Sequence, residues 1–586
     1  MKTIDEKIPN PAEIEKEISE FLSKRFGNHV KIVSPMMVTD PDDVDGAGKK
    51  VHGTAGINFD LKPEDLIAYL DRYIVRQDTA KAILATKICT HFNRIKRQRQ
   101  SGAPARDMVG RIKNNVLLIG PTGVGKTYIV KLIAQHIGVP FVKGDATKFS
   151  ETGYVGGDVE DLVRDLVREA GDDIELAQHG IIYIDEIDKI AGSRNMIGAD
   201  VSRSGVQRAL LKPMEETEVD LKVPHDPVSM IQEIENFRKT GQKEKRTVNT
   251  GNILFIMSGA FNELDDIIRT RVAKQGIGFG APLKKGGPDP AMLQQVKSED
   301  LIAFGFESEF VGRLPVRAVL EPLDENDLYE ILKNPSNPII LGKKFDFDAY
   351  GIDIKFDDQA LRLLARAASA ENTGARGLVS AIERALLLYE TRLPSTNLRQ
   401  FPVTAEVISD PGISLNAMLT ADRAEIEPTF RRLSEQEKES IKTYIRNNRH
   451  ILADRYNLTL TPSRLDTLAR FYVNHILDIG QVFQQIRARY DDIKDIELAF
   501  YKRNDINIVL EEDAIDFIME QIVDKAVTLD EIARQLNESF ELGLKLVLEK
   551  TGKNRFFVNR EALENPESYI SGLIRNGLKT PSLPSK

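Results

Sequence analysis

A glycine-rich segment set between an apolar run and an amphipathic stretch constrains this chain more than any other feature. Residues 120–127 read Gly-Pro-Thr-Gly-Val-Gly-Lys-Thr, and the four residues before them, Val116–Ile119, are all apolar. The residues after them carry apolar side chains at helical spacing. A strand, a glycine-rich turn and a helix in this order form a phosphate-binding loop, in which backbone N–H groups and the helix N-terminus surround the phosphates. The sequence therefore predicts a nucleoside triphosphate site in an α/β fold.

The residue types within this segment suggest individual roles. Lys126 would reach the phosphates as a point charge, and the Thr127 hydroxyl would ligate Mg²⁺. The alternative, a glycine turn that happens to lie near a lysine, leaves the full spacing and both flanks unexplained. We therefore expect ATP and Mg²⁺ as ligands. The residues expected to surround the nucleotide here are Pro121, Thr122, Gly123, Val124, Gly125, Lys126, Thr127 and Tyr128.

Two carboxylates, Asp185 and Glu186, follow a second apolar run. Such a run fits the centre of a parallel sheet that is covered on both faces. The carboxyl ends of strands in these sheets line the crevice where ligands bind. Asp185 would then hold Mg²⁺ through its water shell, and Glu186 would orient and polarise the attacking water. The two acids could also be merely solvated, but the phosphate-binding loop upstream favours the catalytic interpretation.

Further apolar runs at residues 140–143, 253–257 and 316–320 predict additional strands. Strands that alternate with helical segments indicate a doubly wound parallel α/β sheet. Ser258 follows one of these runs, so its hydroxyl could sense the γ-phosphate or the water. A serine after a strand is also a common turn residue.

Length and composition set outer limits on the function. A chain of 586 residues is too long for one core and predicts several domains. The net charge of -9 argues against charge-driven nucleic-acid binding, and no run is long enough to span a membrane. The single cysteine, Cys89, excludes a disulfide framework and a cysteine zinc module. With no apolar signal segment at the N-terminus, we expect the cytoplasm as the compartment.

Several longer segments carry a resemblance to a known family. They read ATKFSETGYVGGDVEDLVRDLV, AQHGIIYIDEIDKI, SGVQRALL, NILFIMSGAF, FGFESEFVGRLP and ENTGARGL. Over residues 61–411 the chain resembles the ClpX family of AAA+ ATPases of the Clp/Hsp100 type, and secondarily the HslU family. The large inserted domain of HslU has no room here between Gly156 and Ile181, which favours the ClpX family. The resemblance implies an AAA+ large domain at 61–330, an α-helical lid at 331–415 and a protein unfoldase driven by ATP.

The resemblance also implies further nucleotide-site residues. Arg313, in the sequence G-R-L-P, would reach the γ-phosphate of a neighbouring subunit, which requires a ring and implies a homohexamer. Arg376, in the sequence G-A-R, would report the nucleotide state to the lid. Ile74 and Val75 would bracket the adenine. For either arginine alone, a surface salt bridge would be the default interpretation.

Three segments would connect the ATPase to its partners. Tyr154 and Val155 match the family's pore loop, which grips an unfolded or tagged protein substrate. Asp200-Val201-Ser202 stands where a second pore loop would lie. Ile277, Gly278 and Phe279 match the loop by which the family docks on a ClpP-type peptidase, although a buried turn is the alternative. We expect no membrane partner and no nucleic-acid partner.

The chain departs from the family at both ends. Residues 1–60 offer only a short helix at 12–26 and a linker, in place of the family's four-cysteine zinc domain. Arg76 stands where the family usually has glycine, and an insertion at 228–246 would either contact substrate or form a solvated hairpin. Residues 416–586 form a predicted C-terminal extension that is mainly helical, with some β structure.

This extension contains a possible repeat of the lid. The lid pattern Ile352-x-Ile354 recurs as Ile506-x-Ile508, with a looser echo at Leu458-x-Leu460. Each copy predicts a short strand that leads into an amphipathic helix, although generic periodicity could produce the same pattern. Thr528, Leu529 and Asp530 then occupy the register of Gly374, Ala375 and Arg376. A copy without the arginine cannot sense nucleotide.

The favoured function is therefore an ATP-dependent unfoldase and translocase that feeds a ClpP-type protease. The chain itself shows no peptidase motif. One alternative is a remodelling chaperone that works without a peptidase. A nucleic-acid motor is the other alternative, with the basic cluster at residues 94–99 as its main support.

Overall fold

The structure is a computed structural model of the 586-residue chain. It describes residues 57, 59–101, 113–149, 158–192, 201–221, 246–275, 290–421, 423–525 and 527–579. Several of the predicted features lie outside these described residues: the helix at 12–26, Tyr154, Val155, Asp200, the insertion up to residue 245, and Ile277, Gly278 and Phe279.

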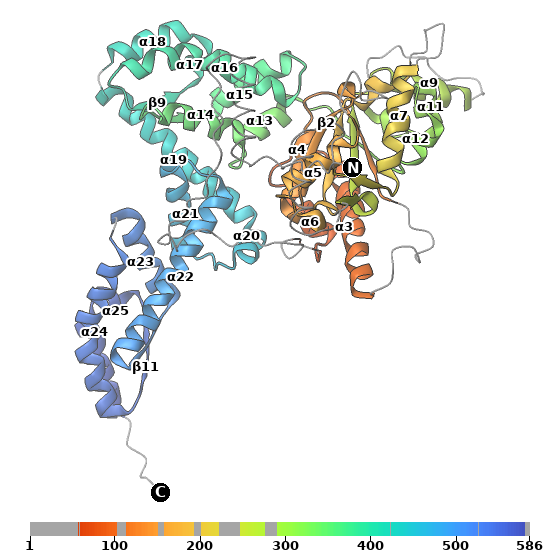
Figure 1. Ribbon diagram of the computed structural model, residues 1–586. Helices are drawn as coiled ribbons and strands as arrows, with labels where there is room; N and C mark the ends of the chain where they lie inside the picture. Colours follow the sequence, from red (N-terminus) through yellow and green to blue (C-terminus); the bar gives the residue numbers. More distant parts are fainter. Residues whose placement is uncertain are drawn as a thin grey trace, which may run out of the picture. The chain divides into compact units, whose positions relative to one another are not determined.

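Five parallel strands form a central sheet in the order β2-β3-β6-β1-β7 (Figure 1). This confirms the predicted α/β class. Ser258, which we expected just after a strand, lies inside β6 and is completely buried. The strands are β1 (Val116–Ile119), β2 (Phe141–Asp145), β3 (Ile181–Asp185), β6 (Leu254–Gly259) and β7 (Val316–Val319).

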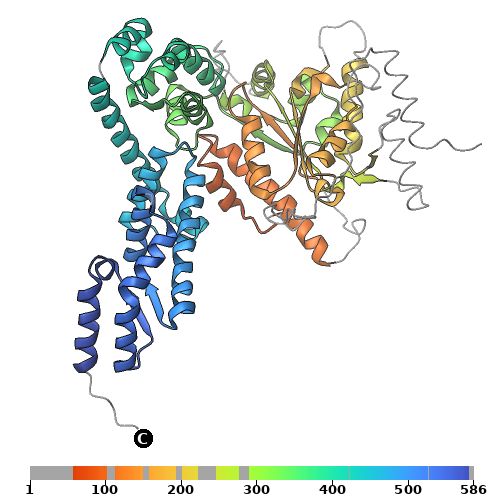
Figure 2. The same ribbon diagram turned by 60° about the vertical axis from the view of Figure 1, so that its left-hand side comes forward.

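Helices cover both faces of this sheet (Figure 2). Successive side chains of a strand point to opposite faces, so Leu118 joins the core on one side and Leu117 the core on the other. Burial on both faces explains why these strands are almost uniformly apolar. One face packs on α2 (Pro63–Leu70), α3 (Asp78–Ser101) and α4 (Lys126–Ile137). The other packs on α5 (Asp161–Glu169), α7 (Val201–Met214), α9 (Leu264–Gln275), α11 (Ser298–Phe304) and α12 (Ser308–Gly312).

Smaller elements complete this part of the chain. Strands β4 (Glu218–Asp220) and β5 (Thr247–Asn249) pair antiparallel. The short helices are α6 (Ile174–Ala177), α10 (Pro290–Leu293), η3 (Ala146–Lys148), η4 (Ile187–Ile190) and η5 (Thr250–Asn252). Among the described residues, no helix combines the length and apolar character needed to cross a bilayer.

The following segment, called the lid from here on, runs from α13 to α18 and so extends beyond the expected bounds of 331–415 at both ends. It is mainly helical with a two-stranded parallel sheet, β8·β9, and its own hydrophobic core. Its elements are α13 (Glu325–Lys333), α14 (Pro338–Asp348), β8 (Asp353–Phe356), α15 (Asp358–Ala370), α16 (Ala375–Arg392), η6 (Leu393–Ser395), β9 (Gln400–Val403), α17 (Ala405–Ser409) and α18 (Pro411–Thr420).

The extension follows as a third region with a continuous core. Its helices and strands confirm the expected mainly helical character. They are α19 (Arg423–Asn447), α20 (Arg449–Tyr456), α21 (Pro462–Asn474), α22 (Ile479–Asn504), β10 (Asn507–Leu510), α23 (Glu512–Lys525), α24 (Leu529–Thr551), β11 (Arg555–Val558), α25 (Arg560–Glu564) and α26 (Pro566–Lys579).

The last part of the extension has the same element order as the lid. In both, a strand, two helices and a second, parallel strand are followed by a five-residue helix and a helix that begins at proline. The backbone N–H after each first strand donates to the last strand at 2.9 Å, from Asp357 to Val403 and from Glu511 to Val558. Duplication of the lid stays a prediction, but the connectivity it requires is present.

The looser echo at Leu458-x-Leu460 is not a strand. Residues 458–460 have no strand partner, and both leucines are instead buried in the core of the extension. An apolar alternation predicts a strand only where a second strand can complete its backbone hydrogen bonds.

The extension contacts both the lid and the large domain. Glu437 of α19 forms ion pairs with Lys344 and Lys355 of the lid. Tyr472 donates its hydroxyl to the Pro335 carbonyl at 3.1 Å, and Pro335 lies in the connection between α13 and α14. The Arg455 guanidinium lies 5.0 Å from the centre of the Tyr69 ring in α2.

Candidate nucleotide-binding site

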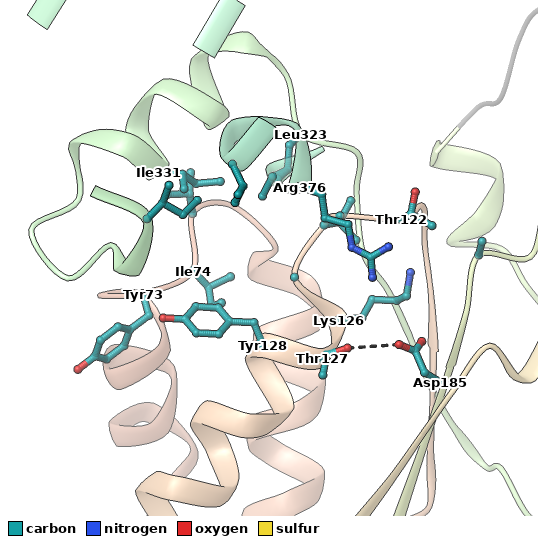
Figure 3. Close-up of a pocket in the computed structure, with 18 of the residues that line it drawn as sticks. Tyr73, Ile74, Thr122, Lys126, Thr127, Tyr128, Asp185, Leu323, Ile331 and Arg376 are labelled. Atoms are coloured by element: carbon teal, nitrogen blue, oxygen red, sulfur yellow. Dashed lines mark hydrogen bonds between the residues drawn. The ribbon is translucent and has the colours of Figure 1, made fainter. Parts of the chain in front are cut away.

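A cavity of about 450 Å³ lies at the carboxyl ends of β3 and β6, between the glycine-rich loop and the lid (Figure 3). This volume suits a small-molecule ligand. The predicted residues in its lining are Ile74, Val75, Thr122, Gly123, Val124, Gly125, Lys126, Thr127, Tyr128, Asp185, Glu186 and Arg376. Pro121 and Ser258 are not part of the lining but adjoin it.

The glycine-rich loop packs directly against the lid. The Gly123 backbone has a φ of 76°, and a Cβ at this position would lie 2.0 Å from the Thr373 carbonyl oxygen. Ala375 donates its N–H to the Gly123 carbonyl at 2.8 Å. Gly374, with a φ of 63°, would place a Cβ 2.8 Å from the same carbonyl. Only glycine fits both the backbone conformation and the close approach.

Lys126 begins helix α4, with its side chain inside the loop. Its ammonium group donates to the carbonyls of Gly120 and Pro121, both at 2.7 Å. Burial lowers the pKa of Lys126 to about 8, although the nearby Asp185 carboxylate opposes this shift. The loop therefore holds a cation whose charge is only partly compensated, which favours an anionic ligand.

Asp185, at the end of β3, lies among oxygen and nitrogen partners. Ser258 donates its hydroxyl to Oδ1 at 2.6 Å, and the Lys143 ammonium lies 3.1 Å from Oδ2. Burial alone would raise the pKa of Asp185, but these two partners bring it below its ordinary value. The Thr127 hydroxyl lies 3.5 Å from Oδ2. An ionised carboxylate beside a hydroxyl fits the oxygen ligands that Mg²⁺ prefers.

Glu186 follows immediately and faces the cavity. Its backbone has a φ of 57°, in the left-handed region, where a non-glycine residue is uncommon. This conformation ends the strand, and Glu186 donates its own N–H to Asp185 Oδ1 at 3.1 Å. The Glu186 side chain is exposed. The two carboxylates therefore differ in environment: Asp185 is held by its partners, and Glu186 is accessible to water.

The opposite end of the cavity is lined by aromatic and aliphatic side chains. Tyr73, Ile74 and Val75 line this end together with Leu323 and Ile331, and Figure 3 shows Ile74 across the cavity from Ile331. A largely apolar slot of this kind suits a nucleobase. Ile74 is almost completely buried.

Arg76, which stands where the resemblance leads us to expect glycine, has an unusual backbone conformation. Its φ is 61°, which glycine adopts more readily than other residues. The guanidinium contacts Glu321 at 2.9 Å and Asp327 at 2.7 Å. These ion pairs tie the segment before α3 to the first turn of the lid and offset part of the backbone cost.

The two predicted arginines lie in different places. Arg376, in the first turn of α16, points into the cavity near Lys126 (Figure 3). Arg313 is not part of the lining; its side chain is about half exposed and pairs with Glu215. The chain therefore brings Arg376 to its own cavity and presents Arg313 on another surface.

The sequence did not single out several residues that the structure places at the site. Tyr73, Asn334 and Ser336 line the cavity. Asn337 caps α14 just before Pro338, an Asn-Pro signal that could have located the start of this helix. Tyr183 reads as an ordinary aromatic residue of a buried strand, yet its hydroxyl lies among the site residues.

Comparisons with known proteins agree with this geometry. Residues 111–317 match the AAA domain (Cdc48 subfamily), and residues 323–391 match the C-terminal, D2-small domain, of ClpB protein. Two similar proteins are each named ATP-dependent Clp protease ATP-binding subunit ClpX. The one from Treponema denticola is 40% identical over 342 residues, which cover 58% of this chain and 79% of the relative. The one from Borrelia duttonii is 39% identical over 354 residues, which cover 60% and 79%.

Proposed function

Because this chain belongs to the ClpX family of AAA+ ATPases, we propose that it is an ATP-dependent protein unfoldase and translocase that delivers substrates to a ClpP-type peptidase. The chain is an ATPase and not itself a peptidase. Its relatives are named as ATP-binding subunits of an ATP-dependent Clp protease, which supports the peptidase partnership. The cytoplasm is the proposed compartment.

The cavity residues divide the work of hydrolysis. Lys126 and the loop N–H groups would bind the phosphates, and Arg376 would contact them from the lid. Thr127 and Asp185 would hold Mg²⁺, which neutralises charge on the phosphates when it is bound. Glu186, the exposed carboxylate, would accept a proton from the attacking water and orient it.

The position of Arg313 supports a ring. A guanidinium suits the charge that develops on the transferring phosphoryl group. Since Arg313 lies outside its own chain's cavity, it would act on the nucleotide of a neighbouring copy. A closed ring of identical subunits, a homohexamer, satisfies this requirement for every site.

The observation that carries the proposal is the direct contact between the phosphate-binding loop and the lid. Gly123 and Ala375 are joined by a backbone hydrogen bond, and Arg376 follows at once. A change at the γ-phosphate therefore reaches the lid without an intermediary. In a ring, movement of lids would displace the loops that carry Tyr154 and Val155, and so pull an unfolded or tagged substrate.

The test combines ATPase, unfolding and degradation assays on the full chain with a ClpP-type peptidase. We expect ATP-dependent degradation of a tagged folded substrate, which is lost in Phe279→Ala, while unfolding and ATPase activity persist. A Glu186→Gln variant should bind ATP, fail to hydrolyse it, and retain captured substrate.

Other outcomes would contradict the proposal. Unfolding with no effect of the peptidase or of Phe279→Ala would favour a remodelling chaperone. Stimulation of the ATPase by DNA that disappears as salt is raised would favour a nucleic-acid motor.

A further inference from the structure

Four oxygen-bearing side chains form a closed ring beside the cavity. Thr127 donates to the Tyr183 hydroxyl at 3.1 Å, and the Tyr183 hydroxyl lies 2.6 Å from Ser258 Oγ. Ser258 donates to Asp185 Oδ1 at 2.6 Å, and Thr127 Oγ1 lies 3.5 Å from Asp185 Oδ2. The proposed function assigns roles to Thr127 and Asp185, and the sequence suggested one for Ser258, but Tyr183 has none.

Tyr183 is placed for this contact by the strand itself. Residues two apart in a strand point to the same face, so Tyr183 and Asp185 both point toward α4, which begins at Lys126. The Tyr183 side chain is completely buried, and its ring lies 6.2 Å from that of Phe141. A phenylalanine would fill the same space, so the hydroxyl contributes through its two hydrogen bonds.

The number of protons fixes the direction of the chain. A carboxylate paired with Lys143 only accepts, so the single proton of Ser258 goes to Asp185. Ser258 must then accept from Tyr183, and Tyr183 in turn accepts from Thr127. The order of donation is therefore Thr127 to Tyr183 to Ser258 to Asp185.

This direction matters for a metal ion. A hydroxyl binds a cation through a lone pair, and its proton must point elsewhere. At 3.5 Å, the carboxylate of Asp185 is a poor acceptor for the Thr127 proton, whereas Tyr183 is within hydrogen-bond distance. In the same series of hydrogen bonds Ser258 donates its proton to Asp185, so it has no proton left to donate to a phosphate.

We propose that Tyr183 is a positioning residue of the ATPase site, which orients the Thr127 hydroxyl and, through Ser258, the Asp185 carboxylate toward the metal ion. This inference rests on the proposed metal ligands Thr127 and Asp185. It changes the expected role of Ser258 from a sensor of the γ-phosphate to a group that fixes Asp185.

The test uses Tyr183→Phe in the full chain, with a fluorescent N-methylanthraniloyl-ADP as the probe. Without Mg²⁺, in EDTA, the variant should bind the probe as the unaltered chain does. The Mg²⁺ concentration for half of the metal-dependent gain in affinity should rise by about 3- to 10-fold, the effect of losing one hydrogen bond. The kcat of ATP hydrolysis should fall by a similar factor and recover at high Mg²⁺.

Two further variants separate positioning from stability. Tyr389→Phe removes another buried tyrosine hydroxyl, which donates within the lid to Val407 and Pro411, and should leave the Mg²⁺ midpoint unchanged. Ser258→Ala breaks the same chain from its other end. The double variant of Tyr183 and Ser258 should shift the midpoint by less than the sum of the two single shifts, because Tyr183 acts on Asp185 through Ser258.

A Tyr183→Phe variant with an unchanged Mg²⁺ midpoint would overturn the inference. Single shifts that add in full in the double variant would refute the action of Tyr183 through Ser258 and so overturn it as well. If the unaltered chain binds the probe equally with and without Mg²⁺, the metal site itself is wrong, and the proposed mechanism of ATP hydrolysis fails with it. The last result appears in the unaltered chain, so it is distinguished from a failure of Tyr183.

Discussion

The charge cluster between the lid and the extension gives the sharpest test of how these two regions are joined. Glu437 pairs with Lys344 and, at 3.1 Å, with Lys355. The two lysine side chains are almost completely buried, while 21% of the Glu437 side chain is exposed. Lys355 also donates to the Val473 carbonyl of α21 at 2.7 Å. Glu437→Gln keeps the shape of the side chain and removes its charge.

The expected cost follows from the two buried ammonium groups that remain. Loss of one partner from a buried ion pair costs about 3–5 kcal/mol. The lower end, about 3 kcal/mol, applies because Glu437 retains some contact with water. At about 1.4 kcal/mol for each factor of ten, this corresponds to about a 100-fold increase in local opening.

Amide hydrogen exchange measures this opening in the full chain, which contains no tryptophan for a fluorescence assay. Protection should fall about 100-fold in β8 and in the part of α19 around Glu437, and not in β1 or β3. Glu439→Gln is the matched control, since Glu439 lies on the same helix, is half exposed and pairs with Lys442. A change in Glu437→Gln no larger than in this control would refute the reasoning.

The pH dependence has a definite sign. Burial alone would raise the pKa of Glu437, but the ammonium groups of Lys344 and Lys355 lower it below its ordinary value. Its contribution to stability is therefore complete above the unfolded pKa of about 4.3, and it is lost as the pH falls through the lower folded pKa. The difference in amide protection between the unaltered chain and Glu437→Gln should stay constant from pH 7 to pH 5.

Three further predictions concern the nucleotide site. Since burial lowers the pKa of Lys126 to about 8 and bound phosphates favour its charged form, ATP binding should take up a proton near pH 8 and weaken by at most about tenfold per unit above it. Calorimetry in buffers of different ionisation enthalpy measures this uptake, and a pH-independent affinity up to pH 9.5 would contradict it. Gly374→Ala should weaken ATP binding about tenfold in a fluorescence titration, because strain of 1–3 kcal/mol displaces the lid, whereas Gly412→Ala, with open space around its Cα, should not. Arg313→Ala should lower kcat by about 10³-fold with ATP binding retained, while Arg376→Ala should weaken binding itself; equal loss of binding in both would argue against action in trans.

Much of the fold could be predicted because short sequence signals coincide there with strong physical requirements. The run Val116–Ile119 is a strand with the predicted bounds, since a strand buried on both faces must be apolar throughout. Ser258 was expected just after a strand but lies inside β6, because a small polar residue at the end of an apolar run looks like a turn residue. The strand expected at Leu458 failed because strand pairing depends on a distant partner, which local alternation does not show.

The site was predictable where the chemistry is local. Lys126, Thr127, Asp185 and Glu186 lie together because the loop and strand that carry them meet at one edge of the sheet. The role of Tyr183 could not be predicted from the sequence, since it depends on hydrogen bonds to residues of β6 and α4 that are distant along the chain. The apolar slot near Tyr73 likewise depends on a lid that folds back over it.

The attachment of the extension at three places has a mechanical consequence. Arg455 contacts the large domain at Tyr69, Glu437 pairs with two lysines of the lid, and Tyr472 bonds to the lid at Pro335, between α13 and α14. Because the extension is attached to both domains, a rotation of the extension would move the lid relative to the large domain and so change the width of the cavity. A force applied to the C-terminal helices would thus change the affinity of the cavity for nucleotide.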